Sequence, residues 1–90
     1  MKPKFENKRL EITYIEGDLP NGTYIFNVYI KDFDTPNLNV EYDYNEKVII
    51  RTWIDENECD NDPKNHVVYK LFSLVENEVF DIMKFIVEHI

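Results

Sequence analysis

The carboxylates of residues 55–62 are the side chains in this chain with the clearest potential for chemistry. Five acids fall within these eight positions, namely Asp55, Glu56, Glu58, Asp60 and Asp62. Clustered carboxylates can chelate calcium, but a helix-loop-helix calcium loop needs Gly at position 6 and Glu at position 12. Counting from Asp55 puts Asp60 and His66 at those positions. The sequence therefore predicts a solvated acidic loop over 55–64, with partner recognition as the alternative role.

Cys59, His66 and His89 are the residues that a zinc site or a thiol catalyst would use. Structural zinc usually needs four ligands in close pairs, and one cysteine with two scattered histidines does not supply them. The acids around Cys59 oppose formation of a thiolate, so this residue is interpreted as an ordinary free cysteine. We therefore expect no metal and no cofactor.

Catalytic motifs give no positive indication of an enzyme. The chain has no Gly-x-Ser-x-Gly sequence and no glycine-rich phosphate loop, and it contains only two glycines. Paired carboxylates remain available for hydrolysis, because acids are abundant. We expect a non-enzymatic protein and keep a small carboxylate-based enzyme or ligand-binding protein as the last alternative.

Four segments alternate apolar and polar residues with the period of two that is typical of strands. These segments are 10–15, 23–31, 38–44 and 47–54. The sequences Asn21-Gly22 and Asn45-Glu46 permit tight reversals between neighbours, so the segments predict an antiparallel meander. Residues 1–9 are expected to form a loose basic tail.

A helix is expected after Asp62-Pro63, because this pair combines an N-cap acceptor with the residue best suited to the first helical position. Apolar residues then recur at spacings of three and four. They are Val68, Leu71, Phe72, Val75, Val79, Ile82, Met83, Ile86 and Ile90. Residues 66–72 also fit a fifth strand, and Ser73 to Glu76 matches a capping box that would begin a shorter helix. The continuous stripe favours the longer helix, with the strand and the shorter helix as the alternative.

The fold class follows from the need to cover one face of the meander. The residues expected on that face are Tyr24, Phe26, Val28, Val40, Tyr42, Val48 and Ile50. The helix stripe is the other large apolar surface, so the two should pack together. The sequence predicts a single α+β domain over 1–90, with an antiparallel meander of about four strands packed on one face by a C-terminal helix.

The second sheet face is expected to mix apolar and polar side chains. Ile15, Ile25, Tyr29, Ile49 and Trp53 project there among acids, amides and Arg51. Exposed Tyr and Trp beside polar groups are typical of a binding patch. A half-buried surface whose isolated apolar side chains have no function is an equal alternative.

The charge of the chain restricts its partners. Residues 1–10 carry four bases against Glu6, a charge of +3, so the remaining residues carry -11 and the whole chain -8. That field repels phosphate backbones and attracts basic surfaces, which disfavours direct nucleic-acid binding. The first residues lack the apolar run of a signal peptide, no apolar stretch is long enough to span a bilayer, and a lone cysteine forms no intrachain disulfide. We expect a cytoplasmic protein without membrane contact.

These features suggest an acidic inhibitor that occupies a basic, nucleic-acid-handling surface of a partner protein, such as a nuclease. The residues expected to bind the partner are Tyr29, Glu41, Asp43, Glu46, Trp53, Asp55, Glu56, Glu58, Asp60 and Asp62. Their carboxylates would imitate a phosphate backbone, and the two aromatic rings would add apolar contact. Phage anti-defence inhibitors and nuclease immunity proteins are similar in charge and size only. The alternative function, from a different class of protein, is that of a structural module that forms a homodimer through the Trp53/Tyr29 face or an edge strand.

Overall fold

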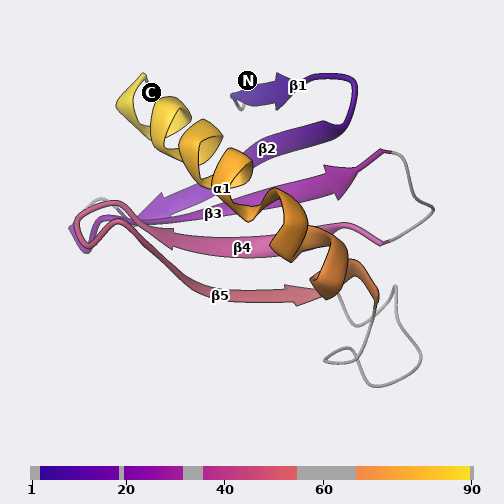
Figure 1. Cartoon of the computed structure of the whole chain (residues 1–90). Helices are drawn as coiled ribbons and strands as arrows, with labels where there is room; N and C mark the ends of the chain where they lie inside the picture. Colours follow the sequence, from indigo (N-terminus) through magenta and orange to yellow (C-terminus); the bar gives the residue numbers. More distant parts are fainter. Residues whose placement is uncertain (1–2, 19, 32–35, 55–66, 90) are drawn as a thin grey trace.

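Five antiparallel strands form one sheet in the order β1-β2-β3-β4-β5, and a single described helix crosses one face of it (Figure 1). The computed structural model describes residues 3–18, 20–31, 36–54 and 67–89. The elements are β1 (Lys4–Glu6), β2 (Leu10–Asp18), β3 (Thr23–Ile30), β4 (Leu38–Asp43), β5 (Val48–Ile54) and α1 (Val67–Glu88). The α+β class and the two-layer packing are confirmed, with five strands in place of about four.

The additional strand, β1, lies within the segment that was expected to be a loose tail. Phe5 stands opposite Ile12 of β2 and packs against the core, and Lys4 Nζ lies 3.2 Å from Glu11 Oε1. The expectation of a loose tail is therefore wrong for residues 4–6. A strand of three residues with one apolar side chain is too short to show a period of two.

The central strands β2, β3 and β4 form the most regular part of the sheet. Along β3, buried residues alternate strictly with half-buried ones, as the sequence predicts. The pairing of β2 with β3 shifts between Tyr14 and Glu16, so Ile15 is an extra residue in β2, a β-bulge. The bulge sets Gly17 directly opposite Tyr24.

A second bulge, in β5, overturns part of the predicted core face. The register with β4 shifts between Glu41 and Tyr42, which leaves Ile50 without a paired residue and sets Ile49 opposite Tyr42. Ile49 packs against the core, whereas Val48 and Ile50 are 48% and 47% exposed. The assignment of Val48 and Ile50 to the core face, and of Ile49 to the other face, is wrong because a one-residue shift reverses the direction of each side chain.

The helix α1 is a single element of 22 residues. Residues 67–72 belong to this helix, so the alternative of a strand at 66–72 is wrong for residues 67–72. Residue 66 lies outside the described ranges. Ser73 lies inside the helix and donates from Oγ to the carbonyl oxygen of Lys70 at 2.8 Å, which excludes its role as a helix cap. The proposed helix entry at Asp62-Pro63 lies outside the described residues.

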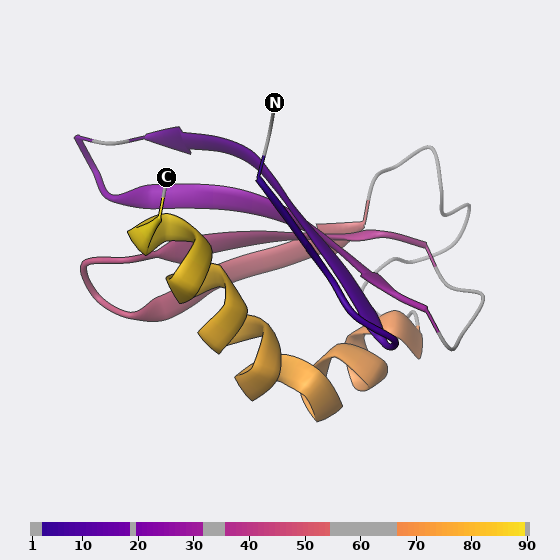
Figure 2. The ribbon, with the colours of Figure 1, turned by 90° about the horizontal axis from the view of Figure 1, so that it is seen from above.

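The core lies between α1 and the sheet, and Figure 2 shows the helix on one side only. The fully buried residues of this core come from three strands and the helix: Leu10, Ile12, Phe26, Val28, Leu38, Val40, Tyr42, Val68, Val79 and Met83. Five residues of the predicted helix stripe are buried, namely Val68, Phe72, Val79, Met83 and Ile86. The described helix is not long and apolar enough to cross a membrane.

Candidate partner-binding face of the sheet

The sheet face opposite α1, which we call the open face, carries the candidate site. The strand registers place these side chains on it: Lys4, Glu6, Glu11, Thr13, Glu16, Thr23, Ile25, Asn27, Tyr29, Asn39, Glu41, Asp43, Val48, Arg51 and Trp53. The described helix lies on the other side of the sheet (Figure 2). Ile25, Tyr29 and Trp53 are half-buried. The open face is therefore a mixed polar and aromatic surface that no described helix covers.

A row of amides crosses the middle of the open face. Asn37 Nδ2 donates to Asn27 Oδ1 at 2.8 Å, and Asn27 Nδ2 donates to Asn39 Oδ1 at 3.2 Å. Asn39 is only 9% exposed and stands opposite Trp53 on β5, while Tyr29 lies two residues from Asn27 along β3. These hydrogen bonds lie between the positions of Tyr29 and Trp53, and they stabilise the pairing of β3 with β4.

Glu41 and Trp53 share one neighbour, Arg51. Arg51 Nε donates to Glu41 Oε1 at 2.9 Å, and its guanidinium carbon lies 4.3 Å from the centre of the Trp53 ring. Glu41 and Arg51 are directly opposite in the β4–β5 register, which explains the ion pair. Glu41 is thus partly neutralised within the chain, which its selection as a partner-binding carboxylate did not take into account.

The open face also carries ion pairs near β1. Glu6 accepts a hydrogen bond from Lys31 Nζ, and the Oε1 atom of Glu6 lies 3.7 Å from Lys4 Nζ. The hydrogen bond and charge of Lys31, followed by the charge of Lys4, lower the pKa of the Glu6 carboxyl. The hydrogen bond and charge of Glu11, followed by the charge of Glu6, raise the pKa of Lys4. At this end of the open face, acids and bases balance one another.

Beside the β2 bulge, the open face has a depression of about 340 Å³. Its lining residues are Glu16, Gly17, Thr23, Ile25 and Glu41. Glu16 is exposed and has no ion-pair partner among the residues that the structure describes. Two carboxylates beside an apolar wall suit the head and the aliphatic stem of a basic side chain. The sequence pattern did not reveal this depression, because the bulge at Ile15 moves Glu16 to this face.

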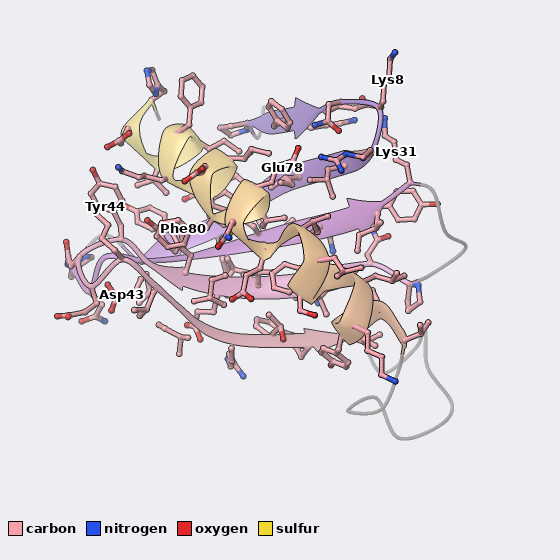
Figure 3. The ribbon with its side chains drawn as sticks, in the orientation of Figure 1. Lys8, Lys31, Asp43, Tyr44, Glu78 and Phe80 are labelled. Carbon is pink, nitrogen blue, oxygen red and sulfur yellow. The ribbon has the colours of Figure 1, made fainter. Side chains whose placement is uncertain are left out.

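Asp43 lies at the end of the sheet (Figure 3), and Glu46 follows it in the turn between β4 and β5. Asp43 Oδ1 accepts a hydrogen bond from the backbone N–H of Glu46 at 3.0 Å, so this acid stabilises the turn. Glu46 is exposed. Tyr44 lies on the helix side, where its hydroxyl donates to Glu88 Oε2 at 3.0 Å, and this hydrogen bond raises the pKa of Tyr44.

The structure thus places four of the expected partner-binding residues, Tyr29, Glu41, Asp43 and Trp53, on one face. Asp43 stands at the end of that face, and Glu46 lies in the adjoining turn. The five acids of 55–62 fall outside the described residues. In the described ranges, no group of three or more His, Cys, Asp and Glu residues is arranged to hold a metal ion.

Comparison with known proteins adds no relative. No protein-family model matches the chain, and neither a curated protein nor a solved structure is significantly similar to it. Any functional argument therefore rests on the open face itself.

Proposed function

We propose that this chain is a non-enzymatic, acidic inhibitor whose open face occupies a basic, nucleic-acid-handling surface of a partner protein in the cytoplasm. The observation that carries the proposal is the joint presence of Tyr29, Trp53 and carboxylates on a sheet face that no described helix covers. Aromatic anchors supply binding energy in such patches, and carboxylates select the sign of the partner's charge.

The depression at Glu16 and Glu41 supports a basic partner in particular. Its volume of about 340 Å³ is at the small end of ligand pockets, which suits one side chain of a partner protein. An entering arginine would find the exposed carboxylate of Glu16 and would compete with Arg51 for Glu41. Ile25 would pack against the methylene groups of the same arginine.

The net charge supports the same partner class at longer range. At -8, the chain attracts basic surfaces and repels nucleic acids, so association should be fast at low salt and weaken as salt rises. In this proposal, the acids at 55–62 add to the net negative charge that attracts the partner.

A salt-dependent capture experiment with matched variants tests the proposal. The immobilised chain is incubated with lysate of its source cells at about 50 mM and about 500 mM salt. We expect the wild type to retain a basic nucleic-acid-binding protein at low salt only. With that partner purified, Trp53→Ala should weaken its affinity at least tenfold, roughly the effect of losing a central aromatic anchor. Conversion of the five acids at 55–62 to Asn or Gln should weaken it further.

Leu74→Ser provides the control, because Leu74 is 82% exposed on the helix and lies away from the open face. This variant should bind as the wild type does, and circular dichroism should show the same fold for all variants. Equal binding by the wild type and Trp53→Ala, or no salt-sensitive partner at all, contradicts the proposal. A homodimer that Trp53→Ala abolishes would instead support self-association through the open face.

A further inference from the structure

We propose that β1 is a self-recognition edge, at which two copies of this chain pair antiparallel about a two-fold axis through Phe5. The pairing would join two five-stranded sheets into one continuous sheet of ten strands. It uses the edge of the sheet and the groove under α1, so it does not depend on partner binding by the open face.

The backbone of β1 has the hydrogen-bonding groups that this pairing needs. Tyr14 N–H donates to the Pro3 carbonyl and Asn7 N–H donates to the Leu10 carbonyl, each at 2.9 Å. Because hydrogen-bonded pairs alternate along an antiparallel ladder, Phe5 also directs its backbone groups to β2. Lys4 and Glu6 therefore direct theirs away from β2, to the edge where no described strand pairs with β1. Among the described strands, β1 has β2 as its one neighbour.

An antiparallel register centred on Phe5 sets Lys4 of each copy opposite Glu6 of the other. In each of these two pairs, the backbone N–H of either residue can donate to the carbonyl oxygen of the other, so the register forms four backbone hydrogen bonds. It also sets opposite charges across the interface twice. A register shifted by two residues sets Lys4 of one copy opposite Lys4 of the other, or Glu6 opposite Glu6. Such a register is unfavourable because like charges then face each other. The charges of β1 therefore select a single register.

The side chains on the helix side of β1 favour the same contact. A groove of about 250 Å³ is lined by Phe5 of β1 and by Asp81, Ile82 and Phe85 of α1. Figure 1 shows β1 beside the C-terminal half of the helix. Phe85 is 58% exposed. In the centred register, the two Phe5 residues form a non-hydrogen-bonded pair, in which cross-strand side chains approach most closely. Each Phe85 would then lie beside the apolar surface of the second copy.

The opposite edge, β5, is less suited to self-pairing. Its bulge at Ile50 interrupts the ladder, and bulges of this kind protect natural sheet edges from association. The register of β1 with β2 has no such shift. Although Val48 and Ile50 are exposed, an interface there would lack the matched charges of Lys4 and Glu6.

Sedimentation velocity on charge-reversed variants tests the proposal. Over a range from about 10 μM to about 1 mM, the wild type should show a concentration-dependent dimer. Lys4→Glu sets two acids opposite each other, and Glu6→Lys sets two bases, so each variant alone should dimerise roughly tenfold more weakly. An equimolar mixture of the two should regain a heterodimer, because the acids at positions 4 and 6 of one variant then face the bases at positions 6 and 4 of the other. The substitutions also disturb ion pairs within each chain, and mixing cannot repair those.

Two further variants locate the apolar part of the interface. Phe85→Ala should weaken the dimer at least tenfold, and Leu74→Ser, on an exposed position of the same helix, should leave it unchanged. A wild type that stays monomeric throughout the range overturns the proposal, as does a mixture of the charge variants that remains monomeric. Loss of the dimer on Ile50→Ser but not on Phe85→Ala would assign self-association to β5 and would also overturn it.

Discussion

The ring of Tyr42 on β4 meets the ring of Phe80 on α1 edge to face, with 5.3 Å between their centres and an angle of 89° between their planes. Figure 3 shows Phe80 on α1, in front of the sheet in that view. This contact joins the helix to the centre of the sheet. The hydroxyl of Tyr42 is buried there and has no hydrogen-bond partner in the described part of the chain, and burial raises its pKa.

Tyr42→Phe should therefore stabilise the protein, because it removes a buried, unsatisfied polar atom and keeps the ring contact. We expect the free energy of unfolding to rise by about 1 kcal/mol. Phe80→Ala should lower it by about 3 kcal/mol, at the low end for a phenylalanine because Phe80 is half-buried, since the ring contact is lost and a cavity is left. Urea denaturation measures both changes. Destabilisation by Tyr42→Phe would mean that the hydroxyl has a partner, such as an internal water.

Arg51→Gln should change stability little and partner binding more. It removes an exposed ion pair with Glu41 and a contact with the Trp53 ring, which together are worth about 1 kcal/mol or less. It also frees the carboxylate of Glu41, so affinity for the basic partner of the proposed function should rise. Urea denaturation and titration with the purified partner check the two effects. Weaker binding would show that Arg51 itself contacts the partner.

The titration of Glu6 should depend on Lys31. Because the folded-state pKa of Glu6 lies below its ordinary value of 4.5, its ion pairs stabilise the fold fully above pH 4.5. That contribution is lost as the pH falls through the lowered pKa. Carboxyl NMR titration should show that Lys31→Met moves the pKa of Glu6 up towards 4.5. Lys8→Met is the control, since Lys8 is exposed and forms no ion pair with a described residue, and an equal shift in both variants would refute the assignment to Lys31.

Gly22→Ala should destabilise the turn between β2 and β3. Gly22 has a φ of 71°, where a side chain is strained, and a Cβ would clash with the side-chain amide of Asn45. We expect the free energy of unfolding to fall by about 2 kcal/mol, as measured by urea denaturation. Adding Asn45→Ala should recover part of the loss, because it relieves the clash and leaves the backbone strain. Full recovery would mean that the φ angle contributes nothing.

The sequence predicted those parts of the fold in which a long pattern repeats without interruption. The eight residues of β3 and the helix stripe from Val68 to Ile86 keep their periods, and both pack as expected. The pattern failed at Ile15 and Ile50, because a bulge adds one residue to one strand and leaves no mark in the hydrophobic alternation. It also missed β1, whose single apolar residue, Phe5, gives no period.

The sequence predicted which residues lie in the candidate site better than it predicted the contacts between them. The alternation in β3, β4 and β5 assigned Tyr29, Glu41 and Trp53 to one face. Which acids are neutralised depends on the register between strands, and the sequence does not specify register. The pairing of Glu41 with Arg51 and the depression at Glu16 therefore emerged only from the structure.

The most direct test of binding through the open face is an NMR titration of the isotope-labelled chain with the basic protein recovered in the capture experiment. We expect the largest shift changes at the Trp53 indole N–H and at the backbone amides of Tyr29 and Glu41, with small changes along α1. Changes confined to α1, around Leu74 and Phe85, would contradict binding through the open face, because they would place the partner on the opposite side of the molecule.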